Sequence, residues 1–321
     1  MKEIAFDDAE YPALLKEIAK PPKKLFVRGD AIQWNEARAA LPPHQKASSV
    51  KTGMNGKKMR SMSQKASDIN PWCGGLPVIA IVGTRRPTPY GKEVAFALAR
   101  DLAMRGVTIV SGLALGIDAA AHKGAIEGGG KTWAVLGSGI DNIQPVYNRG
   151  LAEDIIRADG LIISEYPGVT EATKWTFPER NRIVAGLSSA VIVVEAPVRS
   201  GALITARLAL DANREVGAVP GEVFSVQSGG THMLLRDGAA LIRDANDVLE
   251  LVGVETLGGQ TQFDKLDTIA QDILHSLNAP KTADEIAHVV GKNTAALGEH
   301  LSSLEIEGMI INRGGVFHKI I

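Results

Sequence analysis

Short apolar runs alternate with helical patterns between residues 78 and 252. The expected strands are Val78–Val82, Thr108–Val110, Trp133–Leu136, Leu161–Ser164, Ala190–Val194 and Val216–Val219. Between the first two, Glu93–Arg105 repeats apolar residues at helical spacing and is followed by Gly106, a helix-stop signal. Continuous apolar strands that alternate with helices are typical of a parallel sheet covered on both faces. The pattern predicts a Rossmann-like, doubly wound, mostly parallel α/β domain over residues 76–257.

The chain ahead of this domain follows two other patterns. Residues 1–32 contain the strand-like Leu25–Arg28 and are predicted to extend the α/β domain. Residues 33–75 carry seven Lys and Arg against two acidic residues, with little apolar periodicity. Such a segment buries too little apolar surface to offset the entropy lost on ordering. We therefore predict a basic, disordered insertion there.

The carboxy-terminal residues predict a second, smaller domain. Three amphipathic helices are expected at Leu266–Leu277, Thr282–Val290 and Thr294–Met309, followed by a strand-like Ile310–Ile320 that turns at Gly314–Gly315. Thr282 and Glu285 have the spacing of a capping box. Three helices followed by a β-ribbon are typical of a winged-helix module. We place this module at 263–321, after a linker at 258–262.

Composition narrows the classes of protein that remain. The net charge is −1, so any site for a polyanion must be a local cluster of cations. Cys73 is the only cysteine, which excludes a disulfide framework or a cysteine-rich metal site. The amino terminus lacks the order of a signal peptide, and no apolar run reaches the ~20 residues of a membrane span. We expect a cytoplasmic protein with no membrane partner, cofactor or metal.

Candidate binding residues gather where the predicted strands end. Arg85 follows the first strand, and Lys174, Phe177, Arg180 and Arg182 precede the fifth. Ligands of open α/β sheets bind outside the carboxyl ends of the strands. Cations that hold phosphate, beside a ring that can stack on a base, suit nucleotides or single-stranded nucleic acid.

Two turns at the same edge are predicted to bind anions through their backbone. The glycines of the Ser111, Gly112 and Gly116 loop permit bends that aim several N–H groups at one point, forming a nest. Ser200 and Gly201 open a helix whose free N–H groups attract anions.

Four acidic or basic side chains at this edge allow two interpretations. Asp118 and His122 are either an acid–base pair or a helix N-cap and a hydrogen-bonded ring, and we favour the second. Glu165 and Glu195 close the fourth and fifth strands as possible hydrolytic carboxylates. They could equally bind loop amides and anchor a neighbouring arginine, so both alternatives stay open.

Seven motifs, in order, resemble the DprA (Smf) DNA-processing family. They are Ile81–Arg85, Ser111–Asp118 with His122, Ser164–Glu165, Phe177–Arg182, Val194–Glu195, Ser200–Thr205 and Val219–Gly221. The resemblance runs from about Asp8 to Val252 without the 33–75 segment, and is weaker in the winged-helix module. The chain departs from the family at Gln144–Pro145, where the family has Tyr-Pro. Many members also have a helical amino-terminal domain, whereas this chain starts directly at the Tyr11–Pro12 segment.

This resemblance implies a non-enzymatic DNA-binding protein. Members bind single-stranded DNA taken up in natural transformation, shield it from nucleases and load RecA onto it. The family's DNA contacts fall on Arg85, Lys174 and Phe177 of this chain, and Asn181 falls at the edge of the pocket. The resemblance also implies a homodimer that forms through the Rossmann-like domain.

Two other functions compete with this interpretation. A nucleotide-processing enzyme of the phosphoribohydrolase type carries P-G-G-x-G-T, which neither Pro220–Glu222 nor Gly229–Thr231 fits. A transcription factor needs cations on its DNA-reading helix. The third predicted helix instead carries Glu299 and Glu305, and residues 262–321 hold five Lys and Arg against eight Asp and Glu. We expect that module to contact protein rather than duplex DNA.

Overall fold

The structure, a computed structural model, describes residues 1–29, 77–254, 267–277, 279–306 and 309–319. They belong to two compact units, Met1–Val254 and Glu255–Ile321, which are described separately. The predicted basic insertion at 33–75 and the linker at 258–262 lie outside the described residues.

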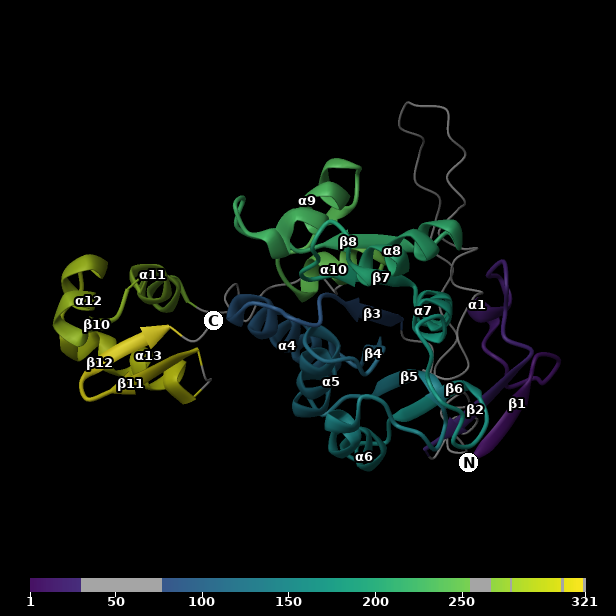
Figure 1. Ribbon diagram of the computed structural model, residues 1–321. Coiled ribbons are helices and arrows are strands. Elements are labelled where there is room, and N and C mark those ends of the chain that lie inside the picture. The colour runs from purple at the N-terminus through teal and green to yellow at the C-terminus, as the bar shows by residue number, and fades with distance from the viewer. Residues whose placement is uncertain (30–76, 255–266, 278, 307–308, 320–321) are drawn as a thin grey trace, which may run out of the picture. The chain divides into compact units, whose positions relative to one another are not determined.

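Among the described residues, the first unit is built on a nine-stranded sheet (Figure 1). Its strands are β1 (Lys2–Ala5), β2 (Lys24–Arg28), β3 (Val78–Val82), β4 (Thr108–Ser111), β5 (Thr132–Gly139), β6 (Leu161–Tyr166), β7 (Ala190–Val193), β8 (Glu215–Ala218) and β9 (Ala240–Leu241). Strands β3 to β9 pair in parallel, and β1 and β2 extend the β6 edge in antiparallel fashion. All six strands predicted for the α/β domain are present, with ends that differ by a few residues.

The strand order creates a crevice beside β3. The order is β1-β2-β6-β5-β4-β3-β7-β8-β9, so the chain builds outward from β3 to β6 and then returns to add β7 on the other side of β3. Pairing of Ile79 with Ala190 and of Val82 with Val193 fixes β7 there. The connections leaving β3 and β7 turn to opposite faces, and such a reversal is where open α/β sheets bind ligands.

Helices cover both faces of this sheet (Figure 1). They are α1 (Ala13–Lys16), α4 (Pro89–Met104), α5 (Ile117–Glu127), α6 (Arg149–Arg157), α7 (Thr176–Leu187), α8 (Gly201–Asp211), α9 (Gly229–Arg236) and α10 (Ala245–Leu251), with short 3-10 turns at Val146–Asn148 and Val226–Ser228. Because side chains alternate along a strand, Ala80 of β3 packs with the buried residues of α1, α7 and α8, whereas Ile81 packs with those of α4, α5 and α10. The predicted doubly wound fold is confirmed.

The second unit has its own small core. Its elements are α11 (Thr268–Ser276), β10 (Lys281–Thr282), α12 (Ala283–Val290), α13 (Thr294–Ile306), β11 (Ile310–Arg313) and β12 (Val316–Lys319). The strands form an antiparallel sheet in the order β10-β12-β11. Ile273, Ile286 and Leu304 are fully buried between the helices. The capping box of Thr282 and Glu285 is present as predicted, and this small helical and antiparallel unit is consistent with the expected winged-helix module.

No helix in the described ranges has the length and apolar composition needed to cross a bilayer.

Candidate nucleic-acid interface

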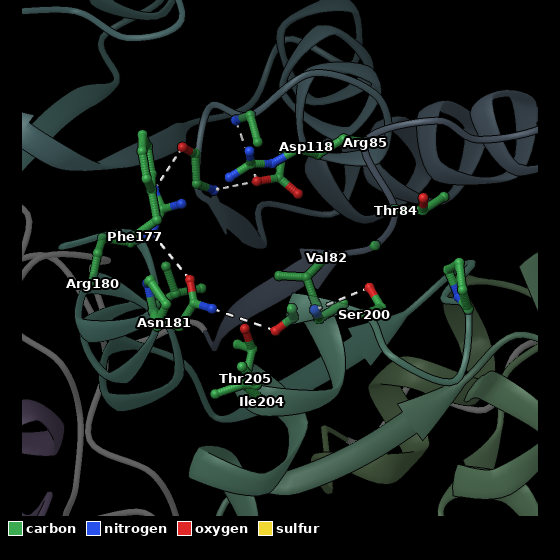
Figure 2. Close-up of a pocket in the computed structure, with 18 of the residues that line it drawn as sticks. Val82, Thr84, Arg85, Asp118, Phe177, Arg180, Asn181, Ser200, Ile204 and Thr205 are labelled. Atoms are coloured by element: carbon green, nitrogen blue, oxygen red, sulfur yellow. Dashed lines mark hydrogen bonds between the residues drawn. The ribbon is translucent and has the colours of Figure 1, made fainter. Parts of the chain in front are cut away.

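A cavity of about 600 Å³ opens at the carboxyl ends of β3 and β7. Its walls come from the loop after β3, from the start of α7 and from the turn that leads into α8 (Figure 2). The predicted site residues that line it are Arg85, Gly112, Asp118, Lys174, Phe177, Arg180, Asn181, Ser200 and Gly201. The remaining ones, Ser111, Gly116, His122, Glu165, Arg182 and Glu195, do not line it.

Arg85 and Phe177 both line the cavity and contact each other. The guanidinium carbon of Arg85 lies 5.2 Å from the centroid of the Phe177 ring, a cation–π arrangement. The ring is half-buried and covers Gly137 at the end of β5, where a Cβ would lie 3.0 Å from it. Phe177 therefore rests on the backbone of β5 while part of its ring stays open to the cavity.

Three exposed cations line this one cavity: Arg85, Lys174 and Arg199. None of the three forms a salt bridge with another residue in the described ranges. Their charges are thus available to an anionic ligand. They form a local cluster of cations on a chain whose net charge is −1. Sequence reasoning missed Arg199, although a cation directly before the helix-opening Ser200 was a usable signal.

Arg180 also lines the cavity, but its side chain holds the fold together. It is only 5% exposed, and its Nη1 donates to the carbonyls of Gly112, at 2.6 Å, and of Val135. Burial lowers the pKa of Arg180 to about 10, while the Asp118 carboxylate opposes this shift and Arg85 adds to it. Arg180 stays charged near neutral pH and ties α7 to the loop after β4 and to the middle of β5.

Asp118 binds the loop that was predicted to bind an external anion. Its Oδ2 accepts hydrogen bonds from the backbone N–H of Gly112 at 3.1 Å and of Ala114 at 3.3 Å. Burial raises the pKa of Asp118, and the nearby Arg180 charge opposes that effect. Because these two N–H groups already donate to Asp118, they are not free to bind an external anion, and the predicted anion-binding nest is wrong for them.

The predicted cap of α5 is also wrong. Gly116, with φ of 85°, is the N-cap, because only glycine adopts that backbone angle without strain. Asp118 therefore lies in the first turn and reaches backward to the loop. Ser111 is fully buried and donates its hydroxyl to the Ile81 carbonyl at 2.7 Å, so it does not face the cavity either.

His122 is a buried, hydrogen-bonded ring, as the favoured interpretation had it. Its Nδ1 lies 2.7 Å from Thr132 Oγ1, and that hydroxyl donates to the Ile109 carbonyl at 2.9 Å. The Thr132 proton is thus engaged, so the His122 Nδ1–H is the donor. Burial lowers the pKa of His122 to about 3, which keeps the ring neutral and unsuited to exchange protons with a ligand.

Arg182 and Glu165 form an ion pair outside the cavity. The Arg182 Nη2 lies 2.6 and 2.5 Å from the two carboxylate oxygens, and its Nη1 donates to the Lys20 carbonyl at 2.7 Å. Residues two apart on a helix are turned by roughly 200°, so Arg182 points away from the side that Arg180 faces. The prediction that both arginines line one pocket is wrong for Arg182, and Glu165 pairs with Arg182 as one of the two interpretations expected.

Glu195 fixes the loop that carries Arg85. Its buried carboxylate accepts hydrogen bonds from the Thr88 N–H at 2.9 Å and from the Thr88 hydroxyl at 2.5 Å. Its backbone carbonyl accepts from the Thr84 N–H at 2.7 Å. The carboxylate thus binds the loop, as one of the two interpretations expected, through the N–H and hydroxyl of Thr88.

Helix α8 begins at the cavity, as predicted. Ser200 is its N-cap and accepts a hydrogen bond from the Ala202 N–H at 3.3 Å. Asn181 of α7 donates to the Gly201 carbonyl at 3.4 Å, which joins the two helices at the cavity edge (Figure 2). In the described ranges, no three His, Cys, Asp or Glu gather as they would around a metal ion.

Comparison with known proteins relates the chain to DNA-processing proteins. The model of the family described as DNA recombination-mediator protein A matches residues 71–253. The DNA processing protein DprA of Bacillus subtilis is 37% identical over 77% of this chain and 70% of its own length. Protein Smf of Synechocystis is 39% identical over 81% of this chain, and the match spans 56% of that longer protein.

Two solved structures share the fold. DNA processing protein A from Streptococcus pneumoniae is 33% identical with a TM-score of 0.62, covering 78% of this chain and 74% of its own. DNA processing protein A from Helicobacter pylori, solved for its single-stranded DNA binding mode, is 29% identical with a TM-score of 0.58. That match covers 78% of this chain and 95% of the other.

Proposed function

This chain belongs to the DNA recombination-mediator protein A family, and we propose that its β3–β7 cavity binds single-stranded DNA. One observation carries the proposal: an aromatic ring that is partly open, Phe177, shares the cavity with three cations that have no acidic partner in the described ranges. The neighbouring Helicobacter pylori structure, solved for its single-stranded DNA binding mode, supports the same choice of ligand.

The proposed division of labour follows from the chemistry of each side chain. Arg85, Lys174 and Arg199 hold phosphates, because their charges are exposed and unneutralised. Phe177 stacks on one base. Every base has a face that can stack, so such binding tolerates any sequence, whereas duplex DNA hides those faces. The cavity is therefore expected to prefer single strands and to ignore their sequence.

The acidic groups and the histidine near the cavity support binding rather than catalysis. Glu165 is paired with Arg182, Glu195 is bound to Thr88, and His122 is buried. Asp118 lines the cavity, but it is largely buried and its Oδ2 accepts hydrogen bonds from two backbone N–H groups. A hydrolase needs an acid or base that can reach its substrate. We propose that the protein is not an enzyme, and we treat nucleotide processing as the alternative that the experiments must exclude.

The family resemblance extends the proposal beyond the cavity. We propose that the protein works in the cytoplasm, protects single-stranded DNA acquired in natural transformation and loads RecA onto it during recombination. We also propose that it acts as a homodimer joined through its Rossmann-like unit. These statements rest on family membership.

The test is a pair of titrations with the full chain. A fluorescently labelled oligothymidylate and a duplex of equal length are titrated by anisotropy, and the protein is separately incubated with nucleoside monophosphates, with and without Mg²⁺. We expect clear preference for the single strand and no turnover. Equal affinity for the duplex, or turnover that E195Q abolishes, would overturn the proposed function.

A further inference from the structure

Trp175 is an exposed ring that directly follows Lys174 of the cavity lining. Its side chain is 67% exposed, whereas Trp133 is fully buried in the core. Tryptophan has a large apolar surface whose burial stabilises a fold, and it is heavily buried on average. A solvent-exposed tryptophan next to a binding site indicates a ring that contacts the ligand.

The turn that presents Trp175 is held in place by two threonines. The Thr173 N–H donates to the Thr176 hydroxyl at 3.0 Å, and that hydroxyl donates back to the Thr173 carbonyl at 3.1 Å. The Trp175 N–H in turn lies 3.3 Å from the Thr173 hydroxyl. The backbone is thus ordered before any ligand arrives, which lowers the entropic cost of binding there.

Lys174 connects this ring to the cavity. Its side chain lines the cavity, and its Nζ lies 5.0 Å from the centroid of the Trp175 ring. Trp175 itself does not line the cavity. The ring therefore lies beside the cavity mouth, next to a cation that a phosphate can reach.

The same pairing of ring and cation occurs inside the cavity. Arg85 lies 5.2 Å from the Phe177 ring, just as Lys174 lies 5.0 Å from Trp175. The two pairs are linked by Lys174, which lines the cavity while its Nζ lies over the Trp175 ring outside it, and together they offer two stacking faces and two cations. That is the repeat expected of a surface that follows a single strand.

We propose that Trp175 stacks on a second base, outside the cavity, with Lys174 bound to the phosphate between it and the base on Phe177. The inference rests on the proposed function and extends it, because it makes the binding track longer than the cavity. Its occupant is a nucleobase of the same strand.

Three substitutions at this position test the proposal by anisotropy with oligothymidylate. W175A is expected to weaken binding by roughly 5- to 150-fold, the loss typical of one stacked base. W175F keeps a ring and should stay close to the wild type, while W175L keeps apolar bulk without a ring and should resemble W175A. Wild-type affinity of W175A, or equal affinity of W175F and W175L, would overturn the second stacking site.

The length of the oligonucleotide gives an independent readout. A strand of about three nucleotides, below the ~4 that a small single-strand site covers, should be almost insensitive to W175A, because it fills the cavity alone. A strand of about twelve should show the full loss. Equal loss at both lengths would contradict a ring that lies outside the cavity.

Controls separate this inference from the proposed function. L210A removes an exposed apolar side chain near the end of α8 remote from the cavity and should leave affinity unchanged. Melting temperatures verify that each variant folds. If F177A and R85A lose binding while W175A does not, only the second stacking site is wrong. If the wild type does not prefer single strands, the proposed function itself is wrong.

Discussion

Arg85 lies over the ring of Phe177, 5.2 Å from its centroid, and so joins the loop after β3 to the first turn of α7. A base that stacks on that ring would take the place of the guanidinium over it, and the released charge would then be close to the phosphates of the same strand. The pair thus brings together the two contacts that a single strand offers, a flat face and a negative charge.

The charge of Arg85 should appear in the salt dependence of binding. R85A is expected to weaken the binding of every single-stranded sequence and to lower the slope of log affinity against log salt by about one unit. R157A, which removes an exposed cation on α6 that does not line the cavity, is the control and should leave the slope unchanged. An unchanged slope in R85A would remove Arg85 from the site.

The charge of Lys174, which also lines the cavity, should affect the salt dependence in the same way. K174A should lower the salt slope by about one unit, and K174Q should do the same because it keeps length but not charge. A loss of affinity with no change in slope would mean that Lys174 acts by supporting Trp175 instead of by holding phosphate.

Phe177 should act through its ring. F177A is expected to weaken single-strand binding by about 1–3 kcal/mol, and F177Y to be mild, since tyrosine also stacks. The ring is half-buried over Gly137, so a modest fall in melting temperature is expected as well. A large fall in melting temperature with affinity retained would instead identify Phe177 as a packing residue.

The arrangement of Glu195 predicts a change in stability and binding together. E195Q removes the charge from a buried carboxylate that accepts two hydrogen bonds from Thr88, so the free energy of unfolding should fall by about 1–3 kcal/mol. The loop that carries Arg85 should loosen, and DNA affinity should fall with it. Hydrogen exchange of residues 84–88 measures the loosening, and unchanged exchange would contradict this role.

Because His122 is buried and neutral, the free energy of unfolding should fall in acid. Its folded-state pKa of about 3 lies below the ordinary 6.5, so the unfolded chain binds the extra proton first. Between those two values the free energy of unfolding should fall by up to about 1.4 kcal/mol per pH unit as pH decreases.

The comparison with a variant isolates this contribution. The raised pKa of Asp118 acts in the opposite direction, so the slope of stability against pH is measured in the wild type and in H122N. The variant should show a shallower slope whatever its absolute stability. Equal slopes would show that His122 does not titrate on unfolding.

The sequence predicted which strands form and which loops meet at their carboxyl ends. It did not predict which way the side chains of a helix point. The apolar runs identified the strands, and the rule that ligands bind at their carboxyl ends placed Arg85, Lys174 and Phe177 at one cavity. Arg182 was assigned to that cavity by its nearness in sequence to Arg180. The helical turn of α7 points it at Glu165 instead.

Helix starts were also hard to predict from apolar spacing. The helix expected from Glu93 begins at Pro89, because Thr88 caps it and proline suits the first helical position. Asp118 was taken for a cap because its residue type suits one, but the backbone of Gly116 decides where α5 begins. Both errors come from reading apolar periodicity or residue type without the backbone angles that the tertiary structure imposes.

Photochemical crosslinking tests the central claim most directly. An oligothymidylate with 5-iododeoxyuridine at successive positions is bound to the full chain and irradiated, and the crosslinked residue is identified by mass spectrometry. Iodouracil couples to aromatic rings that stack on it, so we predict crosslinks to Phe177 that disappear in F177A. Crosslinks to Trp175 are expected to persist in F177A. The absence of any crosslink to Phe177 in the wild type, or crosslinks that fall only within residues 267–319, would contradict a single strand held in the β3–β7 cavity.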